Sequence, residues 1–159
     1  MTQSSIQLYR YDRKYLSEIT TLFNQTIQEI NQQDYSQLEI NEWVQNNPNL
    51  NTWHRRLSES FTLLAIKDLK VIGFGNLEVT GHIDMLFVES SMIRQHIGAL
   101  ILTELTNYQR NELQINVQTV EASITAVSFF EHCGFKIIKR QDNYRHQQNL
   151  VNYQMVREI

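Results

Sequence analysis

Residues 83–105, IDMLFVESSMIRQHIGALILTEL, form the stretch that decides the fold of this chain. An apolar run over 83–88 leads through a polar loop into an amphipathic helix expected over 95–109, which contains Gly98. A buried strand, a short loop and a helix N-terminus together make an anion site. The first N–H groups of the helix lack partners, and the helix dipole adds positive charge there. The stretch therefore predicts a site for a phosphate or pyrophosphate.

The composition is that of an ordinary globular protein. The 159 residues are 42% hydrophobic and 19% charged, with a net charge of −3, which opposes sequence-independent binding of nucleic acid. No apolar run reaches the roughly 20 residues of a membrane span, and residues 1–14 lack a signal core. The single cysteine, Cys133, fits a reducing compartment, and the histidines lack metal-site spacing. We expect a cytoplasmic protein with one domain over 1–159, no metal, no nucleic-acid or membrane partner, and a homodimer as the common default.

Periodicity and capping signals place the other elements. Ser36 and Glu39 fit a capping box, 67–70 fits a hairpin turn, and Gly134 fits the left-handed residue after a helix. The scattered Asn and Gln residues are interpreted as solvated surface. Strands are expected over 6–11, 61–66, 71–79, 83–88, 115–121, 135–139 and 150–156, and helices over 15–30, from 37 to before Pro48, over 95–109 and over 124–133, with a short helical turn at 53–57. This order predicts an α+β fold with a mixed sheet.

Four segments carry a resemblance to a known family. They are Asp34-Tyr35-Ser36 with Leu38 and Trp43, Ile83–Val88, Glu121-Ala122-Ser123 with Ala126 and Phe129–Phe135, and Asn152-Tyr153-Gln154-Met155. In this order they resemble a bacterial subfamily of the GNAT superfamily, the acyl-CoA-dependent N-acyltransferases. The resemblance covers nearly the whole chain. It implies a mostly antiparallel sheet of about seven strands flanked by helices, with a splayed cofactor cleft between strands four and five.

The resemblance also implies acetyl-CoA as co-substrate and a transfer of its acetyl group to a primary amine of a small molecule or peptide. The amine attacks the thioester directly in a ternary complex, and a backbone N–H of the fourth strand stabilises the oxyanion. The pantetheine arm lies along the fourth strand, and the pyrophosphate lies on N–H groups of 94–99. The implied cofactor-binding residues are Leu86, Phe87, Val88, Arg94, Gln95, His96, Ile97, Gly98, Ala99, Ser123, Phe129 and Phe130.

The chain departs from the family pattern in two places. Aligned on Gly98, the pyrophosphate loop has Ile93 where the family has Gln or Arg, and His96 where it has its first glycine. Arg94 also replaces a frequent glycine, and Arg94 and His96 either compensate by their charge or narrow the site. Phe130 stands where many relatives place a tyrosine that protonates the departing thiolate. A thiol with a pKa of about 8.5 still leaves tolerably without protonation.

Three residues are the catalytic candidates: Asp84, Glu121 and Tyr153. Asp84 is either a solvated strand end or a general base whose pKa is raised by partial burial. Glu121 is either a base or a cleft-edge group that binds a cationic substrate. Tyr153, with Tyr144, is a candidate replacement acid, or it packs in the sheet. His82 is a weaker candidate base, and Arg55-Arg56 is interpreted as a solvated helix face.

Three functions remain open from the sequence. The first is the N-acetyltransferase. The second is a CoA-binding regulatory module that has lost catalysis, suggested by the missing glycines and by Phe130. The third is an unrelated phosphate-binding α+β domain. In the resembling fold the acceptor side is built by the first two helices and a late hairpin, here 24–60 and 140–152, and the Asn, Gln and Tyr content of these segments predicts a polar pocket.

Overall fold

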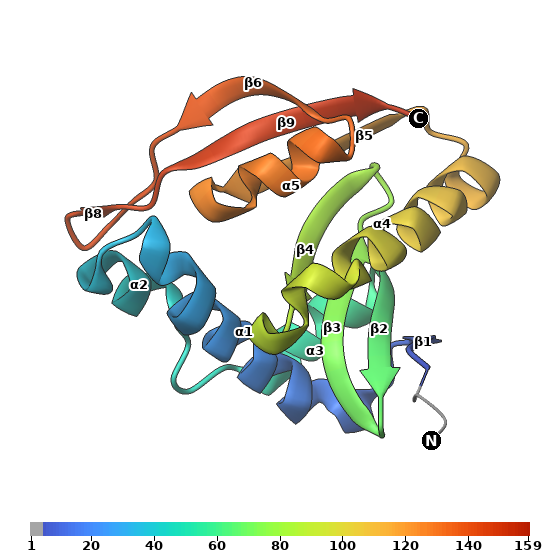
Figure 1. Ribbon diagram of the computed structural model, residues 1–159, viewed down its shortest axis with the longest axis horizontal. Coiled ribbons are helices and arrows are strands. Elements are labelled where there is room, and N and C mark those ends of the chain that lie inside the picture. The colour runs from blue at the N-terminus through green and yellow to red at the C-terminus, as the bar shows by residue number, and fades with distance from the viewer. Residues whose placement is uncertain (1–4) are drawn as a thin grey trace.

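The computed structural model describes residues 5–159, so residues 1–4 of the domain predicted over 1–159 lie outside the described residues. Within 5–159, seven strands form one sheet in the order β1-β2-β3-β4-β5-β9-β6 (Figure 1). The strands are β1 (Gln7–Arg10), β2 (Phe61–Lys67), β3 (Lys70–Leu77), β4 (His82–Val88), β5 (Val117–Ser123), β6 (Lys136–Gln141) and β9 (Asn152–Glu158). Neighbours are antiparallel except β4 and β5, which are parallel. The predicted α+β class and mixed, mostly antiparallel sheet are confirmed.

Helices cover both faces of this sheet. Alternation along β2 explains the two layers, because Leu64 and Ile66 belong to one buried cluster while Leu63 and Ala65 belong to the other. The first cluster packs under α1 (Leu16–Ile30), α2 (Gln37–Trp43) and α3 (Leu50–Ser58). The second packs under α4 (Ile97–Tyr108) and α5 (Val127–His132). Gly75 on β3 permits this approach, because a Cβ there would lie 2.9 Å from the Ile101 side chain.

The local signals in the sequence are reproduced. Ser36 accepts from the Glu39 N–H at 3.2 Å, and Glu39 accepts from the Ser36 N–H at 3.2 Å, which completes the capping box of α2. Asp68 and Leu69 have φ of 51° and 64°, as a tight hairpin turn requires. Gly134 ends α5 with φ of 92°. These elements were predictable because each depends on residues close together in the chain.

Three elements differ from expectation. The short turn expected at 53–57 is a nine-residue helix, α3, because Asn49 caps it by accepting from the Thr52 N–H at 3.1 Å. β5 begins at Val117 rather than 115. Before it, a π-helix over Gln109–Leu113 ends at Gln114, which has a left-handed conformation. Periodicity placed no strand over 140–149, where β7 (Tyr144–Arg145) and β8 (Gln148–Asn149) form a hairpin; only the family resemblance implied a hairpin within 140–152.

A buried polar cluster joins α4 to β5 and β9. Gln109 and Gln118 are fully buried, and the Gln118 amide donates to Gln109 Oε1 at 3.0 Å. Arg157 donates to Gln118 Oε1 at 2.8 Å and to Thr106 Oγ1 at 2.8 Å. The interpretation of Gln as solvated surface is therefore wrong at these positions, because each amide finds partners that only the fold supplies.

β4 and β5 separate soon after they meet. Their register pairs His82 with Thr119 and Ile83 with Val120, and in the described chain the pairing stops at Ile83. From Asp84 to Val88, β4 keeps β3 as its neighbour on one side and has an open edge on the other. Figure 1 shows the two strands diverging, with β5, β9, β6 and α5 on one side of the molecule. The predicted splay between strands four and five is confirmed.

No helix within residues 5–159 is long and apolar enough to cross a membrane.

Candidate active site

A cavity of about 430 Å³ lies where β4 and β5 separate. Its walls come from α1, β4, the N-terminus of α4, β5 and the start of α5, and the β7–β8 hairpin contributes Arg145. Nine of the residues predicted to bind a cofactor line it, namely Leu86, Phe87, Val88, His96, Gly98, Ala99, Ser123, Phe129 and Phe130. The fold thus brings together three segments that are far apart in the sequence.

Three predicted cofactor residues do not line the cavity with their side chains. Arg94 and Gln95 lie in an exposed 3₁₀ segment, Ser90–Gln95, that precedes α4. Ile97 is 1% exposed and belongs to the core beneath α4. The prediction that these three side chains lie at the cofactor cavity is therefore not supported by the lining of the cavity.

His96 lies at the turn that begins α4. It has φ of 60° and ψ of 23°, the left-handed conformation that glycine adopts at little cost. The position that is glycine in the resembling family is thus left-handed here although it carries histidine. Gly98 lies in the first turn of α4, and a Cβ there would come within 3.3 Å of the Phe129 ring. The turn before α4 therefore has its left-handed residue without a glycine at that position. Gly98, in turn, permits the contact between α4 and α5.

Asp84 forms a fixed ion pair in the cavity wall. The Arg56 Nε and Nη2 atoms each donate to one Asp84 oxygen at 2.6 Å, and the Asn76 amide donates to Asp84 Oδ2 at 3.0 Å. Burial raises the pKa of this carboxyl, but the Arg56 hydrogen bonds and charge with the Asn76 hydrogen bond outweigh it, so the pKa of Asp84 is lowered. The expectation of a raised pKa is therefore wrong, because Arg56, whose side chain is 45% exposed on α3, pairs with Asp84.

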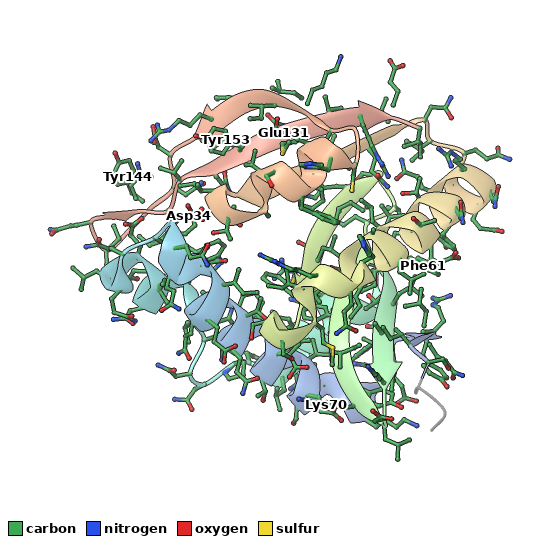
Figure 2. All side chains as sticks on the ribbon, in the orientation of Figure 1. Asp34, Phe61, Lys70, Glu131, Tyr144 and Tyr153 are labelled. Carbon is green, nitrogen blue, oxygen red and sulfur yellow. The ribbon has the colours of Figure 1, made fainter. Side chains whose placement is uncertain are left out.

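The other predicted catalytic residues are placed differently. Glu121 lines the cavity from β5, as expected for a residue facing the cleft. Tyr153 is on β9, opposite Ala122, where it packs against the core and does not line the cavity (Figure 2). Tyr144 is 71% exposed and lies outside the cavity as well. His82 Nδ1 contacts Thr119 Oγ1 at 2.8 Å, where β4 and β5 join.

Several polar residues of the cavity were not found from the sequence. Arg56 and Arg145 line it from α3 and from the β7–β8 hairpin. Asn31, at the end of α1, lines it while only 5% exposed. The Thr125 hydroxyl is a buried lining group that has no hydrogen-bond partner among the described residues. For Asn31, Arg56 and Arg145 the only sequence signal was the polar character of 24–60 and 140–152, which predicted a polar pocket without naming its residues. Thr125 lies outside both segments and had no such signal.

Tyr35 joins the two sides of the cavity. Its hydroxyl donates to the Val151 carbonyl at 2.5 Å and accepts from the Ile124 N–H at 2.8 Å. Burial is the main reason that the pKa of Tyr35 is raised to about 12. The side chain thereby links the start of α2 to the segment after β5 and to the β8–β9 connection.

Within residues 5–159, no group of three or more His, Cys, Asp or Glu side chains is arranged to hold a metal ion.

The fold is shared with solved acetyltransferases. A GCN5-related N-acetyltransferase from Rhodopseudomonas palustris has a TM-score of 0.91, with 24% identity, 100% of this chain covered and 99% of that chain. The PaiA N-acetyltransferase from Thermoplasma acidophilum, solved in complex with coenzyme A, has a TM-score of 0.77, with 19% identity, 98% of this chain covered and 99% of that chain. A sheet split between parallel strands, with a cavity at the split, is thus the fold of an N-acetyltransferase.

Sequence comparison identifies the family. The model of the acetyltransferase (GNAT) domain matches residues 31–157. The uncharacterized N-acetyltransferase YafP from Escherichia coli K12 is 30% identical over 138 residues, which is 87% of this chain and 86% of that protein. This chain belongs to the GNAT acetyltransferase family.

Proposed function

We propose that this chain transfers the acetyl group of acetyl-CoA to a primary amine of a small molecule or peptide, by direct attack in a ternary complex. The observation that carries the proposal is the open edge of β4 in the cavity wall beyond Ile83. An unpaired strand edge presents N–H and C=O groups that an amide-bearing chain can pair with. In this proposal the pantetheine amides of acetyl-CoA take that place along Leu86, Phe87 and Val88.

The start of α4 is the proposed pyrophosphate site. Its free N–H groups and the positive end of the helix dipole favour an anion. His96, Gly98 and Ala99 line the cavity there, whereas Arg94, Gln95 and Ile97 have only backbone groups to offer. Coenzyme A in the T. acidophilum relative supports this choice of phosphate ligand. Phe129 and Phe130, whose rings are 5.1 Å apart, then cover the pantetheine arm from α5.

Glu121 is the proposed acceptor of the amine proton, directly or through one water. It lines the cavity from the strand opposite β4, whereas the Asp84 carboxylate is occupied by Arg56 and Asn76. A carboxylate that forms a bidentate pair and has a lowered pKa is a poor base, so we assign Asp84 the positioning of Arg56 instead. Phe130 has no proton to give, so the thiol of CoA leaves as its thiolate, which a pKa of about 8.5 permits.

One observation favours a second candidate, a CoA-binding module without catalysis. Phe130 is 4% exposed and presents a ring, not a hydroxyl, to the cavity. Such a module would bind CoA and acetyl-CoA but release no thiol with any amine. An unrelated phosphate binder would prefer ATP in competition with CoA. Both alternatives therefore differ from the transferase in measurements that need no knowledge of the acceptor.

The decisive experiment measures melting temperature with acetyl-CoA and thiol release with a panel of amines. A micromolar Kd should raise the melting temperature by several degrees at saturating ligand. Gly98→Glu places a carboxylate against the proposed pyrophosphate, and Leu100→Glu adds the same charge to an exposed site of α4 outside the cavity. We expect Gly98→Glu to abolish the shift and Leu100→Glu to keep it. No shift in the unmodified protein, or equal loss in both variants, would refute the site.

Circular dichroism controls for folding, because the Gly98 Cβ position lies 3.3 Å from the Phe129 ring. If Gly98→Glu is unfolded, Ala99→Glu replaces it, since Ala99 lines the same end of the cavity and the substitution adds the same charge. Thiol release in the presence of amine, at a rate above hydrolysis, supports the transferase. Binding without release would leave the regulatory module as the function.

A further inference from the structure

Two of the charged residues that line the cavity have no ion-pair partner in the described part of the chain. Arg56 and Asp84 neutralise each other through their two hydrogen bonds. Arg145 and Glu121 also line the cavity, and within residues 5–159 neither forms an ion pair. The site therefore holds one uncommitted cation on the β7–β8 hairpin and one uncommitted anion on β5.

We propose that the acceptor is an amine that also carries a carboxylate or a phosphate, as an amino acid or a phosphoamine does. This inference rests on the proposed transferase function. The ammonium group of such an acceptor would approach Glu121, and its anionic group would approach Arg145. A ligand with both charges meets both uncommitted groups, whereas a simple amine leaves the Arg145 charge without a partner.

Two further polar groups of the cavity could bind the anionic group of such an acceptor. The Asp84 pair uses Nε and Nη2 of Arg56 and leaves Nη1, on the same rigid guanidinium, as a donor for a ligand. The Thr125 hydroxyl oxygen lines the cavity, is buried and has no hydrogen-bond partner within residues 5–159. A buried hydroxyl without a protein partner at a cavity is expected to bind a polar ligand group.

The hairpin that carries Arg145 is held in place by the next residue. His146 Nδ1 lies 2.6 Å from Glu42 Oε2 on α2. His146 and Gln147 have φ of 45° and 69°, which makes the tight turn between β7 and β8. The Asn149 side chain accepts from the Asn143 N–H at 3.0 Å and closes the base of the hairpin. Arg145 is therefore presented to the cavity by a fixed turn.

Matched acceptors test the proposal. We compare phenylalanine with phenethylamine, lysine with cadaverine, and phosphoethanolamine with ethanolamine, measuring kcat/KM by thiol release. A charge-assisted pair with Arg145 should favour the anionic member about tenfold or more. A preference for phenylalanine or lysine over its simple amine would identify the acceptor as an amino acid. A preference for phosphoethanolamine over ethanolamine would identify it as a phosphoamine. Equal or better turnover of the three simple amines would overturn the proposal.

Arg145→Gln should reduce the ratio of anionic to simple amine about tenfold, whereas Arg140→Gln should leave it unchanged. Arg140 is the matched control because it pairs with Asp142 at 2.8 Å and does not line the cavity. Calorimetric binding of the same amines to the CoA-loaded protein separates this inference from the transferase. Selective binding of the anionic amines without thiol release would refute acetyl transfer and leave the acceptor class standing. Equal binding of anionic and simple amines would refute the acceptor class and leave acetyl transfer standing.

Discussion

Arg56 and Asp84 join α3 to β4 across the cavity wall, with the Arg56 Nε and Nη2 atoms each 2.6 Å from one Asp84 oxygen. Asn76, fully buried on β3, donates to the same carboxylate at 3.0 Å and to Ser60 at 2.9 Å. The carboxylate that the sequence offered as a base is thus a structural anion that orients an arginine. This relationship changes which variants should affect chemistry and which should affect stability.

Asp84→Asn should lower the free energy of unfolding at pH 7 by about 1–2 kcal/mol, because one charged partner of a partly buried pair is lost. The folded-state pKa of Asp84 is below its unfolded value, so its stabilisation is present above the unfolded pKa and is lost as pH falls through the folded pKa. Urea denaturation from pH 7 down to pH 3 should therefore show the difference from the unmodified protein shrinking. Asp142→Asn, at an exposed pair, is the control with little effect. A constant difference across this range would contradict the assignment.

Glu121→Gln should reduce kcat about 10- to 100-fold at pH 7, because the attacking amine loses its proton acceptor. The deficit should shrink toward pH 10, where a free amine with a pKa of about 10.4 is increasingly deprotonated in solution. Steady-state kinetics from pH 6 to pH 10 measures both effects. Full activity of the variant at pH 7 would mean that water alone removes the proton.

His96→Gly should raise the free energy of unfolding by up to about 1 kcal/mol, because His96 has a φ of 60° that costs a side-chain-bearing residue more than glycine. The affinity for acetyl-CoA should be kept or improved. His96→Ala keeps the Cβ and removes the imidazole, so it separates backbone from side chain. If both variants weaken binding equally in calorimetry, the imidazole itself contacts the phosphates.

Tyr35→Phe should lower the free energy of unfolding by about 1–3 kcal/mol, since it leaves the Ile124 N–H and Val151 carbonyl without their partner. The folded-state pKa of about 12 lies above the ordinary tyrosine pKa of 10.0, so the tyrosine stabilises the fold fully below pH 10 and less as pH rises toward 12. Thermal denaturation between pH 7 and pH 11 should show this alkaline loss in the unmodified protein and not in the variant. Tyr144→Phe, 71% exposed, should match the unmodified protein throughout.

The elements of this fold were predictable wherever their signals are local. The capping box at Ser36, the hairpin turn at Asp68 and Leu69, and the helix end at Gly134 each depend on a few neighbouring residues. The nearly continuous apolar run in β2 is typical of a strand buried on both faces, and it too depends only on neighbouring residues. The strands of the β7–β8 hairpin were not predicted from the residue pattern, because His146 and Gln147 adopt left-handed conformations at a turn that contains no glycine or asparagine.

The sequence by itself determined the family, the mixed sheet and the strand, loop and helix of residues 83–105, because these follow from periodicity, capping and motif order. Only the tertiary structure decided the chemistry of the cavity. Whether Asp84 is a base or an anion paired with an arginine depends on Arg56, which is 28 residues away in the chain. Arg145 reaches the same cavity from the far end of the sequence. A pKa and a charge balance depend on neighbours in space, which the order of residues does not specify.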